Sequence, residues 1–189
     1  MAAAAREIYQ KLGVSAVVAH LEGDDLMPKL DELRAKGISL DHLDKGMPLS
    51  SLEGPVLSAN AYLGGFGIVA ALERGADLVI CPRVTDAALT LGPAAWKFGW
   101  APDDWDRLAA GVVAGHIIEC GAQCTGGNYS FFQEVPGLEH PGFPIAEMRP
   151  DGSFVIAKHP GTGGLVSVGT VTAQLLYEIA GPDYPNPDV

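Results

Sequence analysis

Residues 55 to 86 constrain the fold most strongly, because they have the pattern of one strand–helix–strand unit. A short apolar run at 56–59 follows a proline, and a second apolar run lies at 77–81. Between them, a glycine-rich turn at 64–67 opens an apolar helical run that stops at Gly75. Two buried strands joined by a helix favour a parallel pair with a right-handed crossover. The unit therefore predicts an α/β fold.

The rest of the chain extends this pattern. Periodicity and breaker residues predict a strand at 14–21, a hairpin that pairs 145–148 with 153–158, and helices at 2–12, 27–36, 86–97, 102–119 and 165–179. The last segment is rich in β-branched residues and equally suits a strand, but its apolar positions keep helical spacing, so we expect a helix. We predict an α/β protein, a single domain over residues 1–189, with a mainly parallel sheet, helices on both faces and a small β-hairpin.

Composition limits the partners and the setting of the protein. The formal net charge of −11 argues against nucleic acid or an anionic membrane as the main partner. No apolar run reaches the length of a membrane span, which is about 18 residues. The three cysteines are an odd number without a Cys-x-x-Cys pair, which favours a reduced, cytoplasmic setting.

The predicted sheet is small. A parallel sheet of three strands rarely stands alone, the chain opens with a helix that would normally follow a strand, and it ends in a proline-rich connector. We therefore expect a fragment, or a subunit that another chain completes as a homo-oligomer or with a partner.

Polar side chains follow both strands of the 55–86 unit. Asn60 follows the first strand, and Arg83, Thr85 and Asp86 follow the second. Ligands of open parallel sheets bind beyond the carboxyl ends of the strands. Arg83 can hold a carboxylate or phosphate there while Asp86 handles a proton or hydroxyl. The structural alternative is a local ion pair together with a helix cap from Asp86 or Thr85.

Two glycine-rich turns precede predicted helices, where backbone N–H groups bind anions. Gly64 and Gly65 belong to the first turn, and Thr162, Gly163 and Gly164 belong to the second. Neither turn matches a dinucleotide or P-loop motif, so the alternative is that the glycines only permit tight turns and close packing.

The aperiodic loop after residue 119 is a third candidate region, containing Gly126, Gly127 and Asn128. Glu119 suits a general acid or base, whereas Cys120 is more typical of a small buried thiol than of a nucleophile. We predict that Asp86 and Glu119 converge on one ligand and share acid and base work, although a helix returning from the sheet would place Glu119 at the opposite edge.

Metal and cofactor signals are weak. The acidic turn of Glu22, Asp24 and Asp25 suits Mg²⁺ but is more typical of a solvated turn, and Cys-x-x-x-Cys without a paired histidine is a poor zinc motif. We predict no metal site, and the sequence indicates no particular cofactor.

Several of these stretches resemble the acyclic terpene utilisation family, the AtuA-like proteins. They are 23–26 (GDDL), 60–65 (NAYLGG), 81–88 (CPRVTDAA), 119–127 (ECGAQCTGG), 161–166 (GTGGLV) and 174–179 (QLLYEI). The resemblance covers nearly the whole chain. It implies a bacterial, soluble protein that takes part in the breakdown of citronellol- and geraniol-type branched acids as CoA thioesters. Family members are longer, with a glycine-rich strand before this segment and more domain after it.

The resemblance and the candidate residues together predict a lyase or hydratase acting on a branched acyl-CoA or a related carboxylate. The alternative is a non-catalytic binding or assembly subunit that a partner chain completes.

Overall fold

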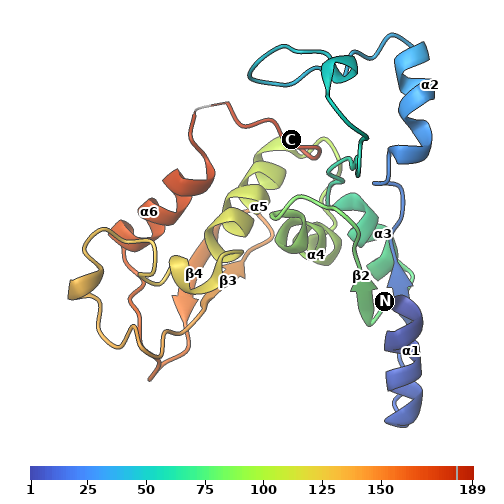
Figure 1. The fold of residues 1–189 in the computed structure, drawn as a ribbon. Helices are drawn as coiled ribbons and strands as arrows, with labels where there is room; N and C mark the ends of the chain where they lie inside the picture. The colour runs from blue at the N-terminus through green and yellow to red at the C-terminus, as the bar shows by residue number, and fades with distance from the viewer. Residues whose placement is uncertain (182) are drawn as a thin grey trace.

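The computed structural model describes residues 1–181 and 183–189, and Figure 1 shows their arrangement. Helices α4 and α5 lie at the centre, with α1, α3 and the first strand pair on one side and α6 with the hairpin on the other. The helices are α1 (Ala2–Lys11), α2 (Leu30–Ala35), α3 (Phe66–Glu73), α4 (Ala88–Phe98), α5 (Trp105–Ile118) and α6 (Val168–Glu178). The strands are β1 (Val18–His20), β2 (Leu78–Ile80), β3 (Pro144–Met148) and β4 (Phe154–Lys158). Short 3-10 turns lie at Met27–Lys29, Leu49–Ser51, Gly121–Gln123 and Phe132–Glu134.

The strand pair β1–β2 is parallel, with Val18 opposite Leu78 and His20 opposite Ile80. The predicted strands at 14–21 and 77–81 are therefore present, although each is three residues long. Mixed helices and strands confirm the α/β character. In the described part of the chain, however, each sheet has two strands, so the mainly parallel sheet covered by helices on both faces is not found.

The strand predicted at 56–59 is wrong. Leu57 is 88% exposed, so its side chain does not pack in the core as that of a buried strand would. The chain here pairs instead with the acidic turn after β1: the N–H of Leu26 donates to the carbonyl of Ala59, and the N–H of Ala61 donates to that of Asp24. Three apolar residues and a serine after a proline resemble a buried strand in sequence, but the local pairing partner decides the structure.

The hairpin and the helix α6 agree with the sequence. Strands β3 and β4 are antiparallel, with Ala146 opposite Ile156. α6 begins with a capping box, in which the Ser167 hydroxyl accepts from the N–H of Thr170 and the Thr170 hydroxyl accepts from the N–H of Ser167. Such a cap stabilises a helix start by about 1 kcal/mol, which favours the helix over a strand despite the β-branched residues.

Helices α4 and α5 form an antiparallel pair that contains most of the core. A Cβ added at Gly115 would lie 2.6 Å from the Cα of Ala87, and one at Gly111 would lie 3.3 Å from Leu91. The start of α4 therefore lies against the end of α5. The core cluster around this contact is Ala87, Leu91, Ala94, Ala95, Trp100, Leu108 and Val112.

The start of α4 differs from the predicted cap. Its N-cap residue is Ala87, and no side chain caps the helix, so neither Asp86 nor Thr85 has that role. Among the described residues, no helix is both long enough and apolar enough to cross a membrane.

Candidate functional site

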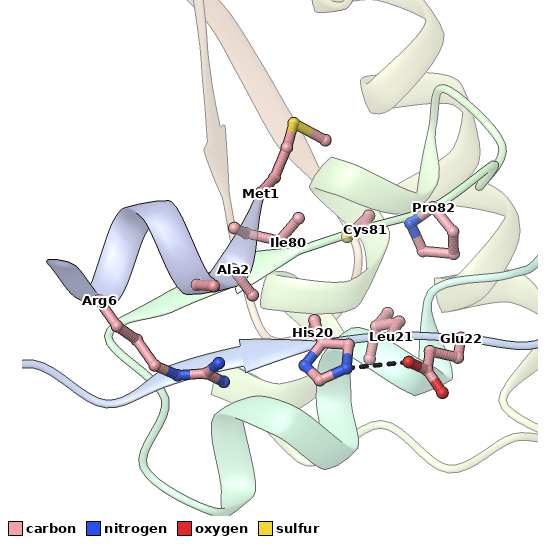
Figure 2. Close-up of a pocket in the computed structure, with 10 residues that line it drawn as sticks. Met1, Ala2, Arg6, His20, Leu21, Glu22, Ile80, Cys81 and Pro82 are labelled. Carbon is pink, nitrogen blue, oxygen red and sulfur yellow. Dashed lines mark hydrogen bonds and ion pairs between the residues drawn. The ribbon is translucent and has the colours of Figure 1, made fainter. Parts of the chain in front are cut away.

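A cavity of about 490 Å³ lies where the two parallel strands end (Figure 2). His20, Leu21 and Glu22 line it from the end of β1, and Cys81 from the end of β2. The first turn of α1 covers it, and the Nε2 of His20 lies 3.0 Å from Glu22. A cavity beyond the carboxyl ends of the strands is where the sequence predicts a ligand, but its lining residues are not the predicted ones.

A second cavity of about 510 Å³ shares His20, Leu21 and Glu22 and extends towards α3. Gly64 lines it together with Asp188. Both oxygens of the Asp188 carboxylate lie 2.9 Å from the N–H of Gly65. A carboxylate of the chain itself therefore occupies the turn that the sequence assigns to an anion.

The predicted residues Asn60 and Arg83 meet through Asp24. The Asn60 side chain donates to the Asp24 carboxylate at 2.8 Å, and the N–H of Arg83 donates to the same oxygen at 3.3 Å. Although desolvation alone raises the pKa of Asp24, these hydrogen bonds lower it below its ordinary value. The guanidinium of Arg83 lies 5.4 Å from the ring centre of Tyr62 and belongs to none of the ion pairs recorded in the described chain. Its charge is therefore free for a ligand.

Thr85 has a buried hydroxyl for which residues 1–181 and 183–189 provide no hydrogen-bond partner. Its N–H donates to the carbonyl of Leu63, the residue before Gly64. A buried unpaired hydroxyl costs free energy unless a water or ligand satisfies it. The Thr85 hydroxyl is therefore a candidate contact for a polar ligand group.

A second group of polar side chains lies where α5 ends beside α6. The Cys120 thiol donates to Glu119 at 2.6 Å and lies 3.6 Å from Glu178. One ligand atom of each residue lies within 4.8 Å of the others. This trio also meets the distance requirement for a metal ion, although thiol and carboxylate donors alone do not distinguish a metal site from a proton-transfer site.

Buried polar residues hold this group in position. Gln174 is fully buried; its side-chain nitrogen donates to the carbonyl of His116 and to Glu178, and its oxygen accepts from Asn128. The predicted site residue Asn128 thus reaches the group through Gln174. Such a connected network fixes the rotamers of its members.

The electrostatics of the group separate its two carboxylates. Burial, followed by repulsion from Glu119, raises the pKa of Glu178 above its ordinary value. The hydrogen bond to Glu119, together with burial and the charge of Glu178, raises the pKa of the Cys120 thiol to about 12. Cys120 is therefore a protonated donor and a poor nucleophile, because the thiolate is the reactive form.

Tyr184 connects this group with Asp86. Its hydroxyl lies 3.0 Å from the Nε2 of His116, and the Nδ1 of His116 lies 2.9 Å from the Val112 carbonyl. The carbonyl only accepts, so Nδ1 carries the proton and Nε2 accepts from Tyr184. Burial, then the charges of Glu178 and Asp86, raises the pKa of Tyr184.

Asp86 and Glu119 are consequently at the same end of the α4–α5 pair. The antiparallel packing of these helices places the residue before α4 beside the end of α5. No hydrogen bond joins the two carboxylates in the described chain. Their sharing of one ligand stays a prediction.

The backbone N–H groups of the remaining predicted glycines donate to carbonyl groups of the same chain. The N–H groups of Gly126 and Gly127 donate to the carbonyls of Gln123 and Ala122. The N–H groups of Gly163 and Gly164 donate to the carbonyls of His140 and Pro136, and the Thr162 hydroxyl donates to that of His159. This second glycine-rich turn packs against the loop 125–142, away from the strand ends.

Sequence reasoning missed Glu178, Gln174, Tyr184 and Asp188. A weak signal exists for the first two, because Gln174 and Glu178 are four residues apart on the predicted helix and so share a face. The contacts of the other two cross 68 and 123 residues, and no local pattern indicates them.

These features define a mixed α/β protein with a cluster of acidic and polar side chains at a helix junction and a glycine-rich turn that the Asp188 carboxylate occupies. A sequence model of the family described as "Acyclic terpene utilisation family protein AtuA" matches residues 1–189. The chain therefore belongs to the acyclic terpene utilisation family, which implies a part in the use of acyclic terpenes. Neither a curated protein nor a solved structure gave a significant match.

Proposed function

We propose that the protein is an acid–base enzyme of acyclic terpenoid acid breakdown, a lyase or hydratase acting on a branched acyl-CoA or a related carboxylate. The observation that supports this most is the pair of Glu119 and Glu178 around one protonated thiol. Burial and a like charge at this distance raise the pKa of Glu178 and so favour its protonated form.

The pair suits the elimination of water from a 3-hydroxyacyl thioester. Glu119 takes the proton from the carbon next to the thioester carbonyl. Glu178 in its protonated form, which its raised pKa favours, gives its proton to the leaving hydroxyl as the carbon–oxygen bond breaks. The reverse order adds water. In a lyase, Glu119 instead takes the hydroxyl proton while the carbon–carbon bond breaks, and Glu178 protonates the enolate.

The other predicted residues have supporting parts in this proposal. Arg83 binds an anionic substrate group, since its guanidinium is free, and the Thr85 hydroxyl supplies a further polar contact. Asp86 lies close enough to raise the pKa of Tyr184 and is the third candidate for proton transfer.

The test is turnover of branched 3-hydroxyacyl-CoA and enoyl-CoA substrates, with product detection by mass spectrometry. Removal of a general acid or base lowers the rate by about 10²- to 10⁴-fold. We expect this loss in Glu119→Gln and Glu178→Gln, and much less in Glu147→Gln, which lies on the hairpin. Equal turnover in all three variants would remove the pair from the mechanism.

One observation favours the second candidate, a binding or assembly subunit. The chain exposes 11,795 Å², whereas a compact monomer of 19.7 kDa exposes about 8,600 Å². A subunit without activity would bind acyl-CoA in the presence of its partner and give no turnover. Turnover by the purified chain alone would exclude this candidate.

A further inference from the structure

The carboxylate of Asp188 lies at the N-terminal end of α3. Both of its oxygens lie 2.9 Å from the N–H of Gly65, the N-cap residue. The first N–H groups of a helix have no partner within the helix and carry a partial positive charge. Asp188 therefore occupies a place that suits an anion, from a segment that is distant in sequence.

Residue 64 must be small for this contact to exist. A Cβ added at Gly64 would collide with the Asp188 carboxylate and would lie 2.6 Å from its Cγ. Gly65 is also confined, because its Cβ would lie 2.6 Å from Leu91. The absence of side chains at both positions thus leaves room for a carboxylate group beside α3, and we call Gly64 and Gly65 together the cradle.

Asp188 is poorly satisfied in this cradle. It is 8% exposed, yet the hydrogen bonds recorded for its carboxylate in the described chain come from one N–H group. A carboxylate can accept about four hydrogen bonds, and no recorded ion pair of the described residues includes Asp188. Asp188 therefore has acceptor capacity that its recorded neighbours in the described chain do not use.

The segment that carries Asp188 is attached at three points, which are Asp188 at α3, Tyr184 at α5 and Val189 against the core cluster of α4 and α5. Asn186 and Val189 exchange backbone hydrogen bonds, and this tight turn presents Asp188 to α3. Tyr184 contacts His116 on α5. Residues 183–189, which we call the strap, have no helix or strand that would fix them further.

The cavity beside the cradle is large enough for an organic ligand. Its volume is about 510 Å³, within the range of about 300–1,000 Å³ typical of small-molecule sites. The titratable groups that line it are His20, Glu22 and Asp188. With Asp188 in place, two carboxylates face the cavity and repel a free anion. When Asp188 is removed, Glu22 is the carboxylate that still lines the described cavity, and the N-terminal end of α3 and His20 remain beside it.

We propose that the Gly64–Gly65 cradle is the binding site for an oxyanion of the ligand, and that Asp188 is its internal occupant, which the ligand displaces together with the strap. The oxyanion is a carboxylate or a phosphoryl group. Binding thereby opens the strap near the acidic group at the α5–α6 junction, because Tyr184 belongs to the same segment. The inference depends on the proposed function only for the class of ligand.

The test measures anion binding by the complete chain, without turnover. Isovalerate, inorganic phosphate and coenzyme A are titrated into the parent, Asp188→Ala and Asp188→Asn, while the Gly65 amide resonance is followed in ¹H–¹⁵N spectra. We expect at least about tenfold tighter binding in Asp188→Ala, an intermediate gain in Asp188→Asn, and movement of the Gly65 resonance on titration. Preference for isovalerate or for phosphate then identifies the oxyanion.

The matched control is Asp183→Ala, which removes the same charge from an exposed position of the strap and should bind like the parent. No gain in Asp188→Ala, an equal gain in Asp183→Ala, or a Gly65 resonance that does not respond would each overturn the proposal. If Asp188→Ala does not fold, Asp188→Asn decides, since it keeps the shape of the side chain. These outcomes are independent of Glu119 and Glu178, whose variants test the chemistry.

Discussion

The protonation state of Cys120 depends first on its hydrogen bond to Glu119, and then on burial and on the charges of Glu119 and Glu178. Its thiol donates to Glu119, so ionisation would place a third negative charge beside two carboxylates. The pKa of about 12, against the ordinary 9.0, lowers the thiolate fraction near neutral pH about a thousandfold.

We therefore expect slow alkylation of Cys120 by iodoacetamide in the native protein. The double variant Glu119→Gln and Glu178→Gln removes both charges and should react much faster. Peptide mass spectrometry after timed quenching measures the rate, and unfolded protein gives the reference for an ordinary thiol. Native Cys120 that reacts as fast as the unfolded reference would contradict this account.

The raised pKa of Glu178 predicts a pH-dependent stability. The folded state binds this proton more tightly than the unfolded state, so the contribution to stability is present below the ordinary value of 4.5 and is lost as the pH rises through the folded value. At neutral pH the ionised carboxylate of Glu178 lowers the free energy of unfolding. Glu178→Gln should therefore raise the free energy of unfolding at this pH.

Urea unfolding at several pH values measures this effect. The Gln variant should lose stability less steeply than the parent as the pH rises from about 4.5 to 7. Glu147→Gln on β3 removes the same charge outside the junction and should follow the parent. Parallel pH profiles for parent and Glu178→Gln would show that the environment of Glu178 is not as described.

At the scale of single residues, the sequence indicated where polar groups lie but not which of them meet. Glu119 and Asn128 were identified because a polar, glycine-rich loop does not serve a core. The partner of Glu119 is Glu178, which α6 brings to α5 across nearly sixty residues. Periodicity marks the buried face of a helix and contains no information on which other helix it packs against.

At the scale of elements, the seam between α4 and α5 decides the geometry of the site. Gly115 has no room for a side chain, since the Cα, Cβ and carbonyl oxygen of Ala87 lie within 2.9 Å of the added Cβ. Gly111, in the same helix, contacts Leu91 at 3.3 Å, where a side chain can shift.

We expect Gly115→Ala to destabilise the protein by about 1–3 kcal/mol, because a backbone contact cannot yield to an inserted methyl group. Gly111→Ala is the matched control and should cost less, since alanine also favours the helix over glycine. Chemical unfolding followed by circular dichroism compares them. A Gly111→Ala variant less stable than Gly115→Ala would contradict the close backbone contact between Gly115 and Ala87.

The helices were predictable because their apolar spacing and glycine ends are local features. The strands were predictable in type for 14–21 and 77–81, but the sheet was not. Segment 56–59 has the composition of a strand, and its neighbours in space are the acidic turn and solvent. Whether an apolar run joins a sheet depends on a free edge beside it, which is a property of the tertiary structure.

At the scale of the whole molecule, the chain leaves an unusual amount of surface exposed. Its 11,795 Å² is more than a third larger than the roughly 8,600 Å² of a compact monomer of this mass. Apolar side chains contribute on the first segment, where Ile8, Leu12 and Val14 are 56%, 68% and 50% exposed. A stable protein interface removes about 800 Å² from each partner, so the excess is sufficient for one.

We therefore predict that the chain self-associates, and that the face formed by α1 and the turn after it takes part. Leu12→Glu places a charge in this face and should shift the particle towards the monomer, as measured by size-exclusion chromatography with light scattering. Leu43→Glu is the control, because Leu43 is 97% exposed and belongs to the loop that follows α2, which Figure 1 shows away from α1. The net charge of −11 opposes association at low ionic strength, so added salt should strengthen it by screening. A parent that remains monomeric at every salt concentration, or equal dissociation of both variants, would contradict this prediction.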